Sequence, residues 1–184
     1  MIPVRLIHRI LADYSLPAGG VHGVAHWARV LENGLRLAER TGARVEVVQL
    51  FAVFHDSRRV NEGWDEGHGR RGAEFAAKLR GEFFQLADDD FDLLYAACAD
   101  HTEGRTEADV TIQTCWDADR LDLGRVGMRP EPLYLCTPAA KDPAMIRWAD
   151  GRGSMGFVPE IVTSTWGLGS KFEVSLRSRT ELTW

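Results

Sequence analysis

Residues 45–56 read VEVVQLFAVFHD, an apolar run that ends in a histidine–aspartate doublet. The run is apolar on nearly every side, with Glu46 and Gln49 as exceptions, and its valines and phenylalanines would also suit a buried strand. Its length and the absence of a second segment to pair with favour a buried central helix instead. The doublet, His55 and Asp56, then lies at the carboxyl end of that helix.

Helical spacing of apolar residues recurs on both sides of this run, so we predict an all-α fold, a compact helical bundle. The predicted helices span residues 2–13, 22–40, 45–55, 70–83 and 91–101, a sixth that starts near Thr106, and 137–149. Gly42 is the expected stop of the second helix. Thr106 with Asp109 resembles a capping box, and Thr137 before Pro138 resembles an N-cap followed by a proline in the first turn.

The remaining segments are expected to be irregular. Glycines and prolines predict loops over residues 61–69 and 124–132. We expect one domain over residues 1–150, with residues 151–184 as an irregular extension that is packed on it or partly disordered. Within the extension, residues 171–176 alternate in polarity, which predicts a short strand or an extended arm.

Composition narrows the classes of function. A chain of 184 residues with a net charge of −5 suits one globular domain and argues against general binding to nucleic acid or to an anionic membrane. The longest uncharged apolar stretch, residues 47–54, is too short to span a bilayer, and the start of the sequence lacks a signal-peptide pattern. The three cysteines form no Cys-x-x-Cys pair, so neither a disulfide framework nor a zinc knuckle is indicated. We therefore expect a protein of the reducing cytoplasm.

The doublet is a candidate ligand pair for a divalent metal, because it offers an imidazole nitrogen and a carboxylate oxygen from one point of the backbone. Further candidates lie upstream and downstream. His22 and His26 are four residues apart on one predicted helix face, and either could be the upstream ligand. Asp117 and Asp119 are two residues apart, so only one of them can face a metal from a helix.

The order of these residues, His…His-Asp…His…Asp, resembles the HD-domain superfamily of metal-dependent phosphohydrolases over about residues 20–125. The segments HWARV and ADRL are similar to the opening and closing motifs of that family, which favours His26 over His22 and Asp119 over Asp117. The resemblance implies an HD-domain helical bundle whose metal ligands are His26, His55, Asp56 and Asp119.

Two further histidines lie in segments similar to those of HD members that use additional histidines. His68 opens a His-x-x-x-Gly-Ala segment, and His101 lies in an Asp-His-Thr-Glu-Gly segment. In such members the extra histidines hold a second metal or contact the substrate phosphate. Here Asp100 stands where the two-metal members carry another histidine, and the Gly-Tyr-Pro that follows in them is missing. We expect one divalent ion (Mn, Fe, Co, Ni or Mg) and leave a second position open.

The resemblance implies hydrolysis of a phosphomonoester, either a nucleotide or another small phosphorylated metabolite, by a metal-activated water. In that reaction Asp56 would orient the water or accept its proton, while His68 and His101 would stabilise the phosphoryl group or protonate the leaving oxygen. Phosphate oxygens also require positive charge nearby, and the candidates for this are Arg58 and Arg29.

Two alternatives stay open. One is a phosphodiesterase that acts on a cyclic nucleotide or single-stranded nucleic acid, which two metals would favour. The acidic pair that signalling-nucleotide hydrolases of the superfamily carry after the doublet is absent here, which weakens any transfer of their substrates. The other alternative is a non-catalytic domain that binds a metal and senses a ligand. The oligomeric state does not follow from the sequence.

Overall fold

The structure is a computed structural model, and it describes residues 2–169. Within that range the protein is all-helical, as predicted, with an isolated bridge between Arg80 and Phe84 and no strand. The elements are α1 (Val4–Ala12), α2 (Val24–Thr41), α3 (Val45–Phe54), α4 (His68–Leu79), α5 (Asp88–Asp100), α6 (Val110–Arg120), η1 (Leu123–Val126), η2 (Pro132–Tyr134), α7 (Pro143–Ser154) and α8 (Ile161–Ser164).

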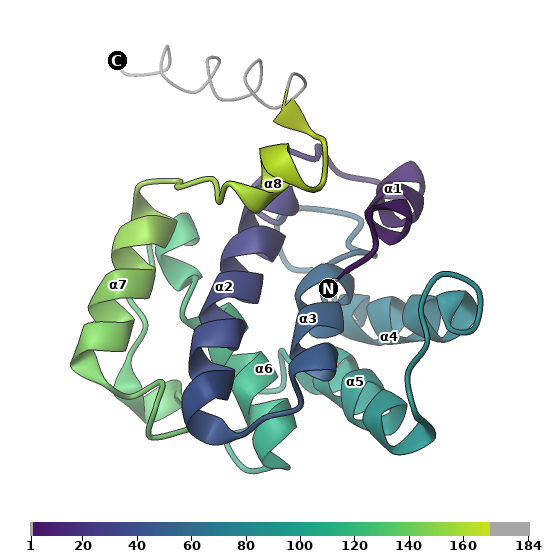
Figure 1. Ribbon diagram of the computed structural model, residues 1–184. Coiled ribbons are helices and arrows are strands. Elements are labelled where there is room, and N and C mark those ends of the chain that lie inside the picture. Colours follow the sequence, from purple (N-terminus) through teal and green to yellow (C-terminus); the bar gives the residue numbers. More distant parts are fainter. Residues whose placement is uncertain (1, 170–184) are drawn as a thin grey trace, which may run out of the picture.

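The central helix is α3, and the prediction of a buried helix rather than a strand is confirmed. Figure 1 shows α2 and α7 on one side of α3 and α4 and α5 on the other, and α1, α2, α4, α5 and α6 all contact α3. Most of its side chains are inaccessible to solvent, which explains why the run is apolar almost all round. Gly34 of α2 allows the close approach of the two helices, because a Cβ atom there would lie 2.5 Å from Val48 Cγ1.

Two glycines let α4 pack tightly against its neighbours. A Cβ atom on Gly72 would lie 2.3 Å from the carbonyl oxygen of Phe54, so α4 crosses directly over the carboxyl end of α3. A Cβ atom on Gly69 would lie 2.3 Å from the carbonyl oxygen of Cys98 in α5. The helix begins at His68, two residues before its predicted start, so this histidine opens α4 and does not lie in the preceding loop.

Two predicted helix starts are wrong. Helix α6 begins at Val110, and its N-cap is Asp109, whose side chain accepts a hydrogen bond from the backbone N–H of Thr111. Helix α7 begins at Pro143 after the N-cap Asp142, and not at residue 138. Thr137 caps only a turn there, because the chain turns again before a second aspartate–proline signal starts the helix.

The described part of the extension packs on the bundle. Helix α7 continues past residue 150, and Val162 and Trp166 are wholly buried. The nitrogen His8 Nε2 lies 3.3 Å from the carbonyl oxygen of Trp166, which ties this segment to α1. The alternating residues 171–176 lie outside the described residues. Among residues 2–169 no helix has both the length and the apolar character that crossing a membrane requires.

Candidate metal centre

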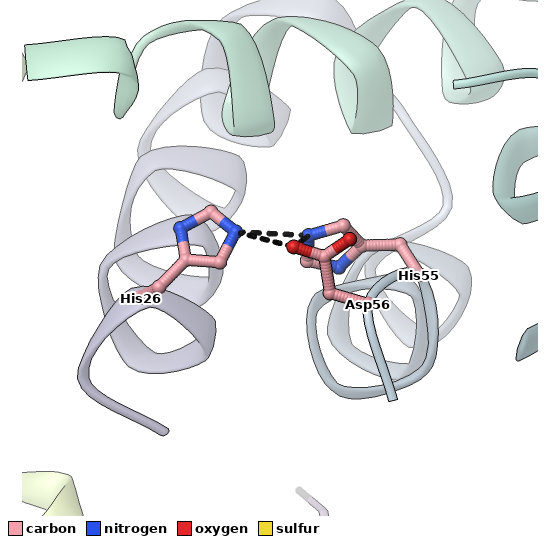
Figure 2. Close-up of side chains that lie close together, drawn as sticks. All are labelled: His26, His55 and Asp56. Atoms are coloured by element: carbon pink, nitrogen blue, oxygen red, sulfur yellow. Dashed lines mark hydrogen bonds and ion pairs between the residues drawn. The ribbon is translucent and has the colours of Figure 1, made fainter. Parts of the chain in front are cut away.

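Helix ends bring four histidines and two aspartates together. His26 lies in the first turn of α2, and the doublet His55–Asp56 directly follows α3; Figure 2 shows the three side chains pointing toward one another. Asp119 comes from the last turn of α6. The side chains of His26, His55 and Asp56 are at most 2% exposed, whereas that of Asp119 is 16% exposed. Asp119 is therefore the most exposed of these four side chains.

The first group of donors joins α2, α3 and α6. The two Nε2 atoms of His26 and His55 are 3.0 Å apart. Asp56 Oδ2 lies 3.5 Å from His26 Nε2 and 3.7 Å from His55 Nε2. Asp119 Oδ1 lies 3.4 and 3.7 Å from the same two nitrogens. Asp56 and Asp119, two of the residues that the HD resemblance names, thus each lie beside the imidazole nitrogens of His26 and His55.

The second group shares Asp56 and extends toward α4 and α5. The other carboxylate oxygen, Asp56 Oδ1, lies 3.0 Å from His68 Nε2 and 3.7 Å from His101 Nε2. These two nitrogens are 3.0 Å apart. Both this trio and the trio of His26, His55 and Asp56 are close enough to hold a metal ion. Asp56 therefore directs one oxygen at each group.

The hydrogen bonds of the histidines leave Nε2 free to coordinate. The Nδ1 atoms of His55, His68 and His101 lie 3.1, 2.6 and 2.8 Å from main-chain carbonyl oxygens. His26 Nδ1 lies 2.7 Å from Asp122 Oδ2. Because a carbonyl or carboxylate oxygen can only accept, Nδ1 carries a proton in each ring, which leaves Nε2 as the nitrogen that can coordinate a metal.

The arrangement fits a bound cation. Asp56 Oδ1 and Asp119 Oδ1 are buried without a hydrogen-bond donor, which is costly unless a positive charge satisfies them. Donor atoms about 2.1 Å from one ion lie about 3.0 Å apart at right angles and about 3.4 Å apart in a tetrahedron. The spacings in the first group begin in that range, at 3.0 and 3.4 Å, and the remaining ones exceed it slightly, at 3.5 to 3.7 Å. Two imidazoles with two carboxylates suit a first-row divalent metal.

Electrostatics keep the ligands in their metal-binding forms. Burial lowers the pKa of His55 to about 3, so this imidazole is neutral at pH 7. Burial raises the pKa of Asp56, but the neighbouring imidazoles lower it by more. The same balance, with Arg125 as the largest opposing influence, holds the pKa of Asp119 below its usual value. A neutral histidine and ionised carboxylates are the forms that coordinate metals.

The two arginines expected to bind substrate do not reach the donor atoms. Arg58 donates to the carbonyl oxygen of Asp13 and covers the ring of Phe75, with 4.2 Å between its Cζ and the ring centroid. Arg29 is buried and donates to both carboxylate oxygens of Asp122, at 2.7 and 3.0 Å. Arg29 therefore faces the back of His26.

Two other arginines reach the cluster. Arg59 Nη1 lies 3.1 Å from His68 Nε2 and 3.5 Å from Asp56 Oδ1. Arg125 Nη2 lies 3.7 Å from Asp119 Oδ1. Each guanidinium is also held by two main-chain carbonyls, those of residues 61 and 63 for Arg59 and of residues 21 and 122 for Arg125. Spacing along the chain does not favour these two over Arg58 and Arg29, because several arginines lie close to the motif residues.

The alternative ligands lie elsewhere. His22 pairs with Glu62, with 2.5 Å between Nδ1 and Oε2, and faces the cluster only edge-on across 6.3 Å between the rings of His22 and His26. Asp117 points away from the cluster and accepts hydrogen bonds from the backbone N–H groups of Cys136 and Thr137.

Comparison with protein-family models, with curated proteins and with solved structures finds no match to this chain.

Proposed function

We propose that the protein is a metal-dependent phosphohydrolase of the HD type that hydrolyses a phosphomonoester, either a nucleotide or another small phosphorylated metabolite. The observation that carries this proposal is the grouping of His26, His55 and Asp56 with Asp119, whose Oδ1 faces the two imidazole nitrogens and is buried without a donor. The motif resemblance in the sequence supports the same conclusion.

The residues around the four donors supply the other needs of phosphoryl transfer. A divalent ion held there would lower the pKa of a bound water and polarise a phosphoryl oxygen. Asp56 Oδ1 faces away from His26 and is the acceptor best placed to take a proton from the attacking water. The Nε2 atoms of His68 and His101 are 3.0 Å apart, and each would donate to a phosphoryl or leaving oxygen when its ring carries a second proton. Arg59 and Arg125 place positive charge on opposite sides of the cluster.

The first group fits an ion better than the second. It offers four candidate ligands, among which Asp56 contributes Oδ2, and Arg125 Nη2 lies 3.7 Å from Asp119 Oδ1. The second offers three donors, and Arg59 already lies 3.1 Å from His68 Nε2 and 3.5 Å from Asp56 Oδ1. A cation there would be repelled by this guanidinium. We therefore assign one ion to the first group and substrate contacts to the second.

The proposal is tested by hydrolysis of an aryl phosphomonoester, its bis-aryl diester and a set of nucleoside monophosphates. Each assay contains Mn²⁺, Co²⁺, Ni²⁺ or Mg²⁺ and compares wild type with Asp56→Ala and the control His8→Gln, which lies outside the cluster. We expect metal-dependent turnover of monoesters, a loss of about a hundredfold or more in Asp56→Ala and no loss in the control. Metal binding without turnover of any of these esters would contradict the phosphohydrolase and support a sensor domain.

A phosphodiesterase is the second candidate, because the two oxygens of Asp56 point to different donor groups. A carboxylate placed in this way can bridge two ions, and paired ions are suited to clamping a phosphodiester. This candidate requires two bound ions per chain and a preference for the diester. One ion with preference for the monoester excludes it.

A further inference from the structure

On the Nδ1 side of His26 lies a series of hydrogen bonds through two buried charged residues, Asp122 and Arg29. Asp122 follows α6 and is wholly inaccessible to solvent. Its Oδ2 accepts from His26 Nδ1 at 2.7 Å, and both of its oxygens accept from Arg29. The remaining Arg29 nitrogen donates to the carbonyl oxygen of Phe157 at 2.7 Å. The resulting order is Phe157, Arg29, Asp122, His26.

This series of hydrogen bonds distinguishes His26 from the other three histidines of the cluster. The rings of His55, His68 and His101 are oriented by main-chain carbonyls of residues three or four positions earlier. The ring of His26 is oriented by a side chain from a different part of the sequence. An ionised partner on Nδ1 fixes the tautomer of a ligating histidine and increases the basicity of the nitrogen that binds the metal.

We propose that Asp122 is a positioning residue of the metal centre: it holds His26 with Nε2 directed at the ion, and Arg29 holds the carboxylate of Asp122 in place through both of its oxygens. Arg29 is suited to this because its planar fork matches both carboxylate oxygens, which a lysine cannot do. The inference rests on the proposed metal centre, but it does not require that the bound metal hydrolyses anything.

The test measures affinity for Co²⁺ alone, by calorimetry and by the visible absorption of the bound ion. We compare wild type, Asp122→Asn and Arg29→Lys. The matched control is Asp117→Asn, which alters another buried aspartate five residues earlier that contacts the 136–137 segment and not the cluster. We expect Asp122→Asn to weaken Co²⁺ binding about 10- to 100-fold and Arg29→Lys to weaken it less. Asp117→Asn should lower Tm and leave the affinity unchanged.

Two results would overturn the proposal. One is that Asp122→Asn and Arg29→Lys lower Tm but leave the Co²⁺ affinity unchanged. Asp122 and Arg29 would then stabilise the fold without positioning His26. The other requires no variant: nitrogen NMR of the metal-free wild type must show the proton of His26 on Nδ1, and a proton on Nε2 contradicts it. If wild type binds no Co²⁺, the metal centre and this inference both fail. If it binds Co²⁺ but hydrolyses no ester, only the phosphohydrolase fails.

Discussion

Replacing Gly72 by alanine should destabilise the protein, although alanine is the better helix former. The new Cβ atom would lie 2.3 Å from the carbonyl oxygen of Phe54, whereas real Cβ atoms stay at least 3.0 Å from such atoms, so α4 and the end of α3 must separate by about 0.7 Å. The obstructing atom belongs to the backbone and cannot rotate away. Overpacking of this kind costs about 1–3 kcal/mol, and the gain in helix propensity returns only about 1 kcal/mol. The free energy of unfolding should therefore fall, by up to about 2 kcal/mol.

Gly151 provides the matched control. It lies inside α7, and a Cβ atom there would meet nothing within 4 Å. Gly151→Ala should raise the free energy of unfolding by about 0.5–1 kcal/mol, so the same substitution has opposite signs in the two helices. At this chain length each kcal/mol corresponds to about 2–4 °C in Tm.

The assay is urea unfolding followed by circular dichroism, with Co²⁺ titration of the folded variants. Separation at Gly72 shifts the backbone that carries His55, so Co²⁺ affinity should fall in Gly72→Ala and stay unchanged in Gly151→Ala. If Gly72→Ala is as stable as wild type or more stable, a Cβ atom at this position does not force α4 and the end of α3 apart. A loss of stability with unchanged Co²⁺ affinity would refute only the link between this contact and the metal centre.

Two further predictions concern the metal and pH. Adding metal at about one hundred times its Kd should raise the stability of wild type by about 2.7 kcal/mol, chelation should remove this gain, and Asp56→Ala should respond to neither treatment. In the metal-free protein burial lowers the pKa of His55 from 6.5 to about 3, so the unfolded chain binds this proton first as the pH falls. Stability should therefore be lost between pH 6.5 and 3, by about 1.4 kcal/mol per pH unit from this residue, and acid unfolding of His55→Gln must show a shallower slope.

The helices and the clustered histidines could be predicted because local signals specify them. The apolar run of residues 45–54 is too uniformly buried to be an amphipathic surface helix, and the doublet that ends it reaches the centre of the bundle. His68 and His101 lie at helix ends as well, where the chain leaves the packed core and a side chain can turn toward a shared point. The spacing and order of residues along the chain are sufficient to predict such positions.

The arginines could not be assigned, because their direction depends on the turn after α3. Arg58 and Arg59 are neighbours in a segment without helical periodicity, so no pattern indicates which of them faces Asp56. Arg29 does share a helix face with His26, as its spacing of three indicates, but that face also meets Asp122. Arg29 binds a protein carboxylate because α2 contacts the segment after α6. The spacing of residues along α2 cannot predict a contact with another segment.

The start of α7 shows a similar limit. Thr137–Pro138 and Asp142–Pro143 carry the same capping signal five residues apart, and only the second begins a helix. Thr137 donates to Asp117 from both its backbone N–H and its hydroxyl, and its hydroxyl oxygen also accepts from the backbone N–H of Ala140. The same local signal therefore starts a single turn at one position and a helix at the other.

The hydrogen bonds on the Nδ1 side of the four histidines have a consequence for how the centre can vary in evolution. Three of the four partners are main-chain carbonyls, which every residue type carries and no point mutation removes. The fourth is a side chain encoded by a single codon. Random mutation can therefore adjust the orientation of this centre through Asp122 far more readily than through the other three partners, and affinity-altering variants from a mutagenesis library should accumulate there and at Arg29.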